Sequence, residues 1–308
     1  MDRVLAGLRM LPTTGFLVLQ GDKTVLDYGD NSSPAYLASV RKSVLSVLFG
    51  RSVGNGAIAL DATLDELGID DVGGLLPIER QARVRDLLTA RSGVYHAPST
   101  ATGLEAGAPE RGSKKPGEHF FYNNWDFNAL GTIFERCTGR SVFDALGEDV
   151  AEPLGFQDFD LGRQRLLGRS DRSVHLAHHF FLSGRDLGRI GQVMLRGGRW
   201  GGRQVVPAEW VAASTSPRVG LAAGAPMGYG YLWWIPQSLP TGTFLAIGNS
   251  GKYLLGIPPE TVVVHQRAVP EDLVVARAEG TAPATSVDGV TPRQFMSLVR
   301  SALQELGR

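Results

Sequence analysis

A serine and a lysine three residues apart are the first pair in this sequence with an evident chemical use. Ser39 and Lys42 begin a stretch, 39–50, in which apolar residues recur at three- and four-residue spacing, as they do in a helix. Positions i and i+3 of a helix share a face, so the hydroxyl and the amine would lie within hydrogen-bonding reach. Burial lowers the pKa of a lysine, so its neutral amine could take the serine proton and make the serine a nucleophile.

The helix start would assist this chemistry. Its free backbone N–H groups and positive dipole end stabilise a developing anion. A Ser-x-x-Lys pattern also arises by chance in many proteins, which is the structural alternative. However, a lysine in an otherwise apolar helix is costly to bury unless it has a partner or a function. This context favours a catalytic interpretation of Ser39 and Lys42.

A tyrosine and an asparagine form the second candidate group, at the start of another helix-like stretch. A tyrosine hydroxyl near a cationic lysine can have a lowered pKa and act as an acid or a base, which is the role expected of Tyr122. Asn124 could bind the lysine or a substrate amide. Taken alone, such a pair is more typical of core packing and turn capping.

A glycine-containing segment, 248–252, is the third candidate group and precedes an apolar run. Glycine allows the edge of a strand to approach a ligand closely. A backbone N–H there could complete an oxyanion hole with the N–H of Ser39. A simple glycine-rich hairpin turn is the alternative that the local sequence favours.

Three histidines close together, His175, His178 and His179, suggest a metal site at first sight. Carboxylate partners at a recognisable ligand spacing are missing, and adjacent histidines point in different directions on a helix or a strand. We therefore expect a loop or a pocket wall there, and any of the three could line the substrate cleft. No metal and no cofactor are expected.

The elements that must position these groups alternate between β and α patterns. A hairpin is expected at 15–29, the buried helix at 38–50, and strands at 228–235, 244–248, 253–256 and 261–265. Helices are expected at 60–67, 84–89, 127–137, 183–195, 207–214 and 291–299, the last with Thr291 as its N-cap.

This order of elements predicts an α+β fold. The two β stretches would form one antiparallel sheet, with the two ends of the chain side by side and the helical middle inserted next to it. We expect a sheet subdomain from 1–60 and 215–308, a mainly helical subdomain from 61–214, and the active site between them.

The composition excludes several classes of protein. With 308 residues, 43% hydrophobic and 20% charged, the chain can build a full core, which excludes disorder, collagen and coiled coil. Lys+Arg (31) equals Asp+Glu (31), which argues against a strongly basic nucleic-acid-binding protein. No apolar run reaches the ~18–20 residues of a membrane helix, and no signal peptide is evident, so a cytoplasmic location is expected. The single cysteine, Cys137, excludes an intrachain disulfide and a Cys-based zinc site.

The three candidate groups, in this order, make the sequence resemble the penicillin-recognising serine hydrolases. The Tyr-x-Asn middle motif resembles the class C β-lactamase branch, which includes carboxylesterases and 6-aminohexanoate-oligomer (amide) hydrolases. The resemblance covers most of the chain. Further stretches that look like members of this branch lie at 87–93, 122–131, 183–187 and 228–234.

The resemblance implies a fold and a mechanism. The fold would be an antiparallel sheet flanked by helices, with a mostly helical subdomain. Ser39 would attack a carbonyl and form an acyl-enzyme, while Lys42 and Tyr122 would move the proton to the leaving group. The oxyanion would lie between the N–H groups of Ser39 and Lys252. The residues that the resemblance assigns to orienting the lysine or the substrate are Asn124, Asn249, Ser250, Gly251 and Lys252.

The third motif departs from the β-lactamase pattern, because Asn249 stands where the family usually has a cation. That cation helps to hold the β-lactam carboxylate, so its replacement favours esters or small amides over antibiotics. The spacing of the glycines resembles the esterase and amide-hydrolase subgroup. Lys252 could supply a charge nearby, although its place beyond the glycine could direct its side chain away.

We therefore expect a serine hydrolase that cleaves an ester or an amide, with a lactam still possible, through an acyl-serine. Its partner would be a small-molecule substrate, with no nucleic acid and no membrane involved. One alternative is an acyltransferase that passes the acyl group to an amine or alcohol in a biosynthetic pathway. Another is a non-catalytic homologue that binds a ligand or a partner protein, but retention of the serine, lysine and tyrosine argues against it.

Overall fold

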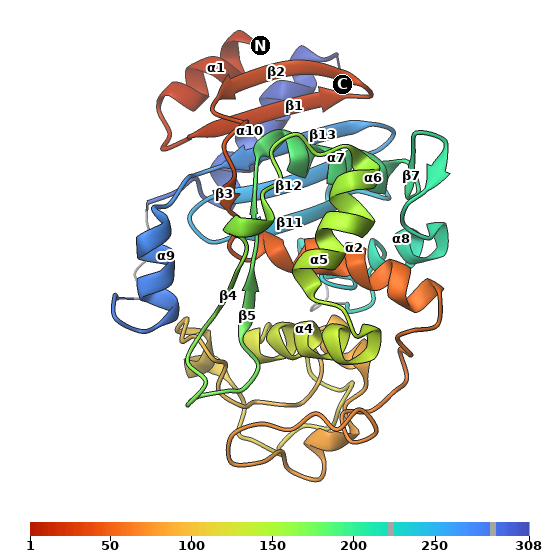
Figure 1. The fold of residues 1–308 in the computed structure, drawn as a ribbon. Coiled ribbons are helices and arrows are strands. Elements are labelled where there is room, and N and C mark those ends of the chain that lie inside the picture. The colour runs from red at the N-terminus through yellow and green to blue at the C-terminus, as the bar shows by residue number, and fades with distance from the viewer. Residues whose placement is uncertain (221–224, 284–287, 308) are drawn as a thin grey trace.

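The main element of the computed structural model is a seven-stranded antiparallel sheet (Figure 1). The structure describes residues 1–220, 225–283 and 288–307. The strands lie in the order β2-β1-β13-β12-β11-β10-β9. Their bounds are β1 Gly15–Gln20, β2 Lys23–Gly29, β9 Met227–Tyr229, β10 Trp234–Pro236, β11 Phe244–Gly248, β12 Lys252–Ile257 and β13 Thr261–Gln266. Three two-stranded sheets complete the named strands: β3 Ala35–Tyr36 with β6 Phe181–Leu182, β4 Arg165–Leu167 with β5 Ala177–His179, and β7 Arg199–Trp200 with β8 Arg203–Gln204.

The first strand of the sheet pairs with the last, as the sequence predicts. The register of β1 and β13 runs from Gly15 opposite Gln266 to Gln20 opposite Thr261. Alternate residues of β1 belong to two different hydrophobic clusters: Leu17 lies in one cluster and Phe16 in the other. Because side chains alternate across a strand, the sheet must be covered on both faces. The α+β fold class is confirmed.

Helices from the two chain ends cover one face of the sheet. α1 (Asp2–Arg9) and α10 (Pro292–Glu305) contribute apolar residues to the same cluster, and the N-terminal amine lies 2.6 Å from Glu305. Thr291 caps α10 as expected: its side chain accepts a hydrogen bond from the N–H of Gln294, and Pro292 follows it. In Figure 1 both termini lie beside the hairpin β1–β2.

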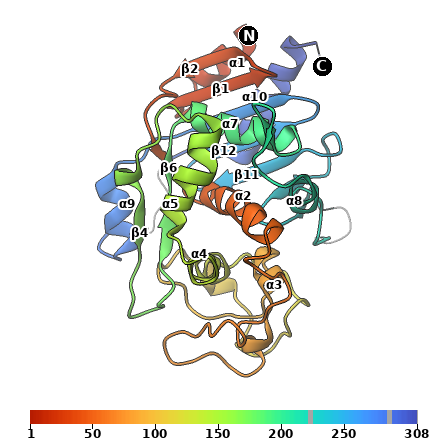
Figure 2. The same ribbon diagram turned by 45° about the vertical axis from the view of Figure 1, so that its right-hand side comes forward.

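The other face is covered by α7 (Gly184–Leu195) and α2 (Val40–Gly54), as Figure 2 shows. Two glycines bring α7 close to the strands, because a Cβ at Gly188 would lie 2.9 Å from Leu19 and one at Gly191 would lie 2.7 Å from Val262. The range 61–214 was expected to form a mainly helical subdomain, yet α7 from that range packs on the sheet. The division at residues 60 and 214 stays a prediction.

The helix α2 is held between the sheet and α4 (Asn124–Thr138). Its apolar side chains enter the core on both sides, for example Phe49, whose ring lies 5.9 Å from that of Phe134. Its buried serines bind a neighbouring turn: Ser43 donates to the carbonyl of Leu232, and Ser46 to that of Tyr231, both at 2.7 Å. These contacts fix the helix that carries Ser39.

That turn explains a difference from the expected strand at 228–235. The segment forms two strands, β9 and β10, joined by residues that hydrogen-bond elsewhere. The N–H of Tyr231 donates to Ser214, and the N–H of Leu232, which has a positive φ of 64°, donates to Leu88. Contacts with three other segments therefore override the local strand pattern.

The prediction of a helix at 60–67 is wrong. These residues form turns, because their backbone groups bind a distant segment: Leu60 and Ala62 accept from Arg85 and Val84, and the N–H of Leu64 donates to Ala82. The apolar spacing reflects anchoring of a loop to the core. The remaining helical elements are α3 Val84–Leu88, α5 Val142–Leu146, α6 Glu152–Leu154, α8 Ala208–Ser214, α9 Glu271–Ala278, the π-helix η3 Gly147–Ala151 and the 3₁₀ turns η1 Glu79–Gln81, η2 Leu104–Gly107 and η4 Leu161–Arg163.

In the part of the chain that the structure describes, none of the helices combines the length and apolar character needed to cross a bilayer.

Candidate active site

Ser39 lies at the N-cap of α2, directly after a strained residue. Ala38 has a positive φ of 48°, which non-glycine residues rarely adopt. The end of β11 packs against this turn, since a Cβ at Gly248 would lie 2.7 Å from the carbonyl oxygen of Leu37 and 3.3 Å from the Cβ of Ala38. The third motif therefore begins beside the backbone that presents Ser39.

The structure brings Lys42 between the two hydroxyl groups predicted from the sequence. Its Nζ lies 2.9 Å from Ser39 Oγ and 2.8 Å from Tyr122 OH. The same nitrogen lies 4.2 Å from the ring centroid of Tyr122 and 4.4 Å from that of Phe127. Only 1% of Lys42 is exposed, so the amine has protein on nearly every side.

Burial sets the protonation of this group. Burial lowers the pKa of Lys42 well below its ordinary value, and the nearby cation Arg41 lowers it further. Burial raises the pKa of Tyr122 to about 12, against smaller opposite effects from Ser39 and Arg41. The sequence-based expectation of a lowered tyrosine pKa is therefore wrong, because desolvation of the phenolate outweighs the attraction of a cation. A neutral Lys42 amine is the better base, and Tyr122 holds its proton.

An aromatic wall surrounds Tyr122. Its ring centroid lies 4.8 Å from that of Phe127, 5.4 Å from that of Trp234 and 6.1 Å from that of Tyr229. The backbone beside it is fixed by Asn123, the N-cap of α4, whose amide accepts from the N–H of Trp125 and donates to the carbonyl of Val94. These contacts fix the position of the phenol beside Lys42.

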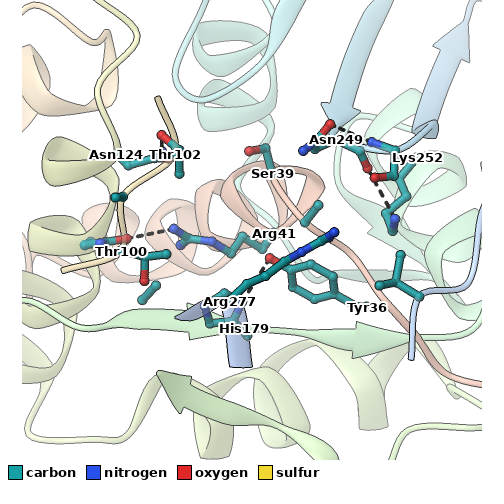
Figure 3. A pocket seen from close by; sticks show the side chains of 16 residues that line it. Tyr36, Ser39, Arg41, Thr100, Thr102, Asn124, His179, Asn249, Lys252 and Arg277 are labelled. Carbon is teal, nitrogen blue, oxygen red and sulfur yellow. Dashed lines mark hydrogen bonds between the residues drawn. The ribbon is translucent and has the colours of Figure 1, made fainter. Parts of the chain in front are cut away.

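Among the hydrogen bonds of the described residues, Asn124 makes none with Lys42, whose Nζ contacts Ser39 and Tyr122. Its Nδ2 donates to Thr102 Oγ1 at 3.1 Å, and its side chain lines a cavity next to Ser39 (Figure 3). Of the two partners proposed for Asn124 from the sequence, the substrate is the one that this position supports.

The third motif forms the tight turn between β11 and β12, with Gly248 paired to Lys252. Ser250 and Gly251 have positive φ angles of 60° and 76°, and Asn249 Oδ1 accepts from the N–H of Ser250 at 2.8 Å. The hairpin-turn interpretation and the functional one are therefore compatible: the segment is a turn, and Asn249, Ser250 and Lys252 line the cavity that contains Ser39.

Lys252 points its side chain into this cavity and not away from it. Nζ lies 3.2 Å from the carbonyl oxygen of Asn249 and 5.9 Å from the ring centroid of Tyr36, and only 3% of the residue is exposed. Burial lowers the pKa of Lys252 to about 7, and the cations Arg267 and Arg277 contribute to the shift. A cation is thus present near the position where Asn249 lacks one.

The cavity itself has a volume of about 150 Å³ (Figure 3). Its walls come from the start of α2, the loop 100–102, the start of α4, β5, the turn 249–252 and α9. The lining residues that the sequence analysis did not propose include Tyr36, Arg41 and Arg277. Arg41 had a recognisable signal, since it is a charged residue inside the Ser-x-x-Lys turn of an apolar helix. The local sequence around Tyr36 and Arg277 contains no pattern that indicates a functional site.

The three histidines bind three different partners. His178 Nε2 lies 3.1 Å from Glu135, His175 Nδ1 lies 2.9 Å from Thr132, and His179 Nδ1 lies 3.1 Å from Tyr36 OH. In residues 1–220, 225–283 and 288–307, no cluster of histidine, cysteine and carboxylate side chains is arranged to hold a metal ion. Among the three, His179 lines the cavity, as the pocket-wall interpretation predicts.

Comparison with known proteins identifies the family. The family model described as Beta-lactamase matches residues 1–278. The chain belongs to the Beta-lactamase family. Among solved structures of the same fold is a protein from Bacillus anthracis described as a candidate 6-aminohexanoate-dimer hydrolase, with a TM-score of 0.70 and 19% identity over 97% of this chain and 80% of that one. The expected fold, that of β-lactamases and penicillin-binding proteins, is confirmed.

Two curated relatives match part of this Beta-lactamase family chain. The monacolin J acid methylbutanoyltransferase of Aspergillus terreus is 25% identical over 183 residues, which cover 50% of this chain and 44% of that protein. The D-aminopeptidase of Brucella anthropi is 28% identical over 143 residues, which cover 41% of this chain and 26% of that protein. The matches therefore span less than half the length of either relative.

Proposed function

We propose that this protein is a serine hydrolase that cleaves an ester or a small amide through an acyl-Ser39 intermediate. The observation that carries the proposal is the position of Lys42 Nζ, 2.9 Å from Ser39 Oγ and 2.8 Å from Tyr122 OH. These distances suit proton transfer from the serine and onward to the phenol. Membership of the Beta-lactamase family supports the same chemistry.

The proposed reaction runs in two halves. The neutral amine of Lys42 takes the proton of Ser39 while Oγ attacks the carbonyl carbon. Tyr122 then gives its proton to the leaving group as the bond to that group breaks, and the Lys42 ammonium returns a proton to Tyr122. Water attacks the acyl-serine in the second half, with the same pair removing its proton and restoring that of Ser39. The N–H groups of Ser39 and Lys252, at the start of α2 and of β12, would bind the oxyanion.

Esters and small amides fit better than a β-lactam antibiotic. Asn249 replaces the cation that the resemblance assigns to carboxylate binding in β-lactamases, and a cavity of about 150 Å³ suits a short acyl group. We expect short p-nitrophenyl esters to be hydrolysed faster than nitrocefin, and a fluorophosphonate probe to label Ser39. Faster hydrolysis of nitrocefin would contradict the substrate class. Labelling of another residue, or of none in the folded protein, would contradict the mechanism.

Acyl transfer to an amine or an alcohol is the second candidate function. The similarity to the methylbutanoyltransferase of Aspergillus terreus favours acyl transfer. Hydrolysis and acyl transfer would both proceed through the same acyl-Ser39, so the proposed site is compatible with either reaction. Addition of a small amine or alcohol during ester turnover separates the two: a transferase forms the acylated acceptor in excess of free acid, whereas a hydrolase forms mainly acid. A purely binding protein would form neither product.

Replacing Tyr122 with phenylalanine should lower kcat/KM by about 10²- to 10⁴-fold, the range typical of general acid–base catalysis. Because Lys42 must be neutral, activity should rise as the pH passes above its lowered pKa and fall below it. Tyr122, with a pKa of about 12, should give no loss of activity on the alkaline side below about pH 11. The pH profiles of both proteins check this: an alkaline loss near neutral pH that disappears in Tyr122→Phe would mean that the phenol loses its proton there, and would contradict its raised pKa.

A further inference from the structure

The cavity beside Ser39 is lined by cations from three separate elements. Arg41 comes from α2, Lys252 from β12 and Arg277 from α9 (Figure 3). Among the described residues that line the cavity, none is an aspartate or a glutamate. A wall with several cations and no carboxylate favours an anion in the space between them.

Arg41 is the most informative of the three. It is 5% exposed, and its Nη2 donates to the neutral amide oxygen of Asn128 at 2.7 Å. None of the ion pairs found among the described residues includes Arg41. A buried guanidinium is costly without a counter-ion, because it keeps its charge and its several N–H donors. The guanidinium of Arg41 therefore has no carboxylate counter-ion among the described residues.

Lys252 adds a second buried cation on another wall. The hydrogen bond that its Nζ makes is to the carbonyl oxygen of Asn249, again a neutral acceptor. Burial lowers its pKa to about 7, and the neighbouring cations Arg267 and Arg277 contribute to the shift. Arg41 and Lys252 thus face the cavity from two walls, whereas Asn249, at the position that the resemblance assigns to binding a β-lactam carboxylate, is neutral.

The proposed mechanism assigns the cavity to the acyl side of Ser39. Ser39 lines it, whereas Lys42 and Tyr122 do not. The leaving group must receive its proton from Lys42 and Tyr122, so it departs on their side of Oγ and leaves the cavity to the acyl chain. At about 150 Å³ the cavity matches one known to hold benzene, so it accepts a short chain.

We infer that the acyl group which this protein transfers to Ser39 is short and ends in a carboxylate, held by Arg41 and Lys252. The inference rests on the proposed function, because it names the acyl group of that same reaction. Monoesters or monoamides of short dicarboxylic acids are the substrate class. The guanidinium plane of Arg41 suits a bidentate contact with a carboxylate, and Lys252 adds a point charge.

Two esters with the same six-carbon acyl chain test the inference: mono-p-nitrophenyl adipate and its neutral counterpart, methyl p-nitrophenyl adipate. After subtraction of spontaneous hydrolysis, kcat/KM should favour the anionic ester by about tenfold or more. The preference should fall about tenfold in Arg41→Gln and in Lys252→Gln, and should be kept largely in Arg41→Lys, which retains the charge. Arg300→Gln, an exposed residue of α10, is the matched control and should leave the preference unchanged. Equal or greater efficiency with the neutral ester would overturn the inference.

Binding to Ser39→Ala gives a readout that does not need turnover. Calorimetry should show binding of adipate, none of adipamide, and at least about tenfold weaker binding in the double variant with Arg41→Gln. Binding of inorganic phosphate or sulfate in place of adipate would overturn the assignment to a carboxylate. If both esters are hydrolysed equally and adipate does not bind, the proposed anion site is contradicted, whereas the proposed hydrolase activity is supported. If adipate binds but neither ester acylates Ser39, the proposed function is contradicted, whereas the proposed anion site is supported.

Discussion

Replacing Ser39 with alanine should reduce ester hydrolysis by about 10⁴- to 10⁶-fold, the loss typical of removing a catalytic nucleophile. The hydroxyl oxygen is the only atom proposed to form the bond to the acyl group, so no neighbouring group can replace it. The fold should persist, because Lys42 keeps its contact with Tyr122 and the α2 helix keeps its contacts through Ser43 and Ser46. Steady-state hydrolysis of a p-nitrophenyl ester measures the effect.

Ser43→Ala is the matched control for this experiment. Ser43 is a buried serine of the same helix, but its hydroxyl donates to the carbonyl of Leu232 and has a structural role. Its removal should lower stability by about 1–3 kcal/mol through the unpaired carbonyl, with activity kept in the folded protein. A ligand-binding protein without catalysis would lose no function in Ser39→Ala, and retention of full activity there would exclude the acyl-serine.

Replacing Lys42 with methionine should almost abolish acylation, with a loss of about 10³-fold or more, because serine is a weak nucleophile without a base. Methionine fills a similar volume and cannot accept the proton. The rate of the nitrophenol burst, or of fluorophosphonate labelling, measures acylation alone. An unchanged rate would remove Lys42 from the role of base, and Lys114→Met, an exposed lysine in a loop, provides the control.

The same variant should gain stability while it loses activity. The folded-state pKa of Lys42 is lowered, so the unfolded chain binds the extra proton more readily than the folded chain does. Stability therefore rises with pH between the folded and unfolded pKa values, and burial of Lys42 is most destabilising at the low-pH end. The urea midpoint of Lys42→Met should exceed that of the parent by more at about pH 6 than at about pH 9. A midpoint below that of the parent at both pH values would show that Lys42 stabilises the fold.

The sequence predicts the parts of this site that depend on local geometry. The i, i+3 spacing is enough to place Lys42 beside Ser39, because any helix brings those positions together. The capped helix after Thr291 and the hairpin at the N-terminus follow from equally local rules. The contact with Tyr122 could be expected only from the family resemblance, because nothing local brings together residues 80 positions apart.

The parts that depend on tertiary contacts could not be predicted. The segment 60–67 has the spacing of a helix, yet its carbonyl groups bind residues 84 and 85. The pKa of Tyr122 moves upwards because burial, which the sequence does not reveal, outweighs the charge of a neighbour. The sequence shows that residue 249 is neutral and that Lys252 lies nearby, but it does not show that Arg41 reaches the same cavity from α2. Burial and long-range contacts decide each of these cases.

The most direct test of the central claim is to stop the reaction during turnover and look for the acyl group. Mixing the protein with p-nitrophenyl butyrate, quenching with acid in the burst phase and measuring peptide masses should show a butyryl group on the peptide that contains Ser39, and fragmentation should place it on that residue. A butyryl group on another residue would contradict the acyl-serine mechanism. An unmodified Ser39 would also contradict it, provided that turnover continues and the burst kinetics show that deacylation limits the rate.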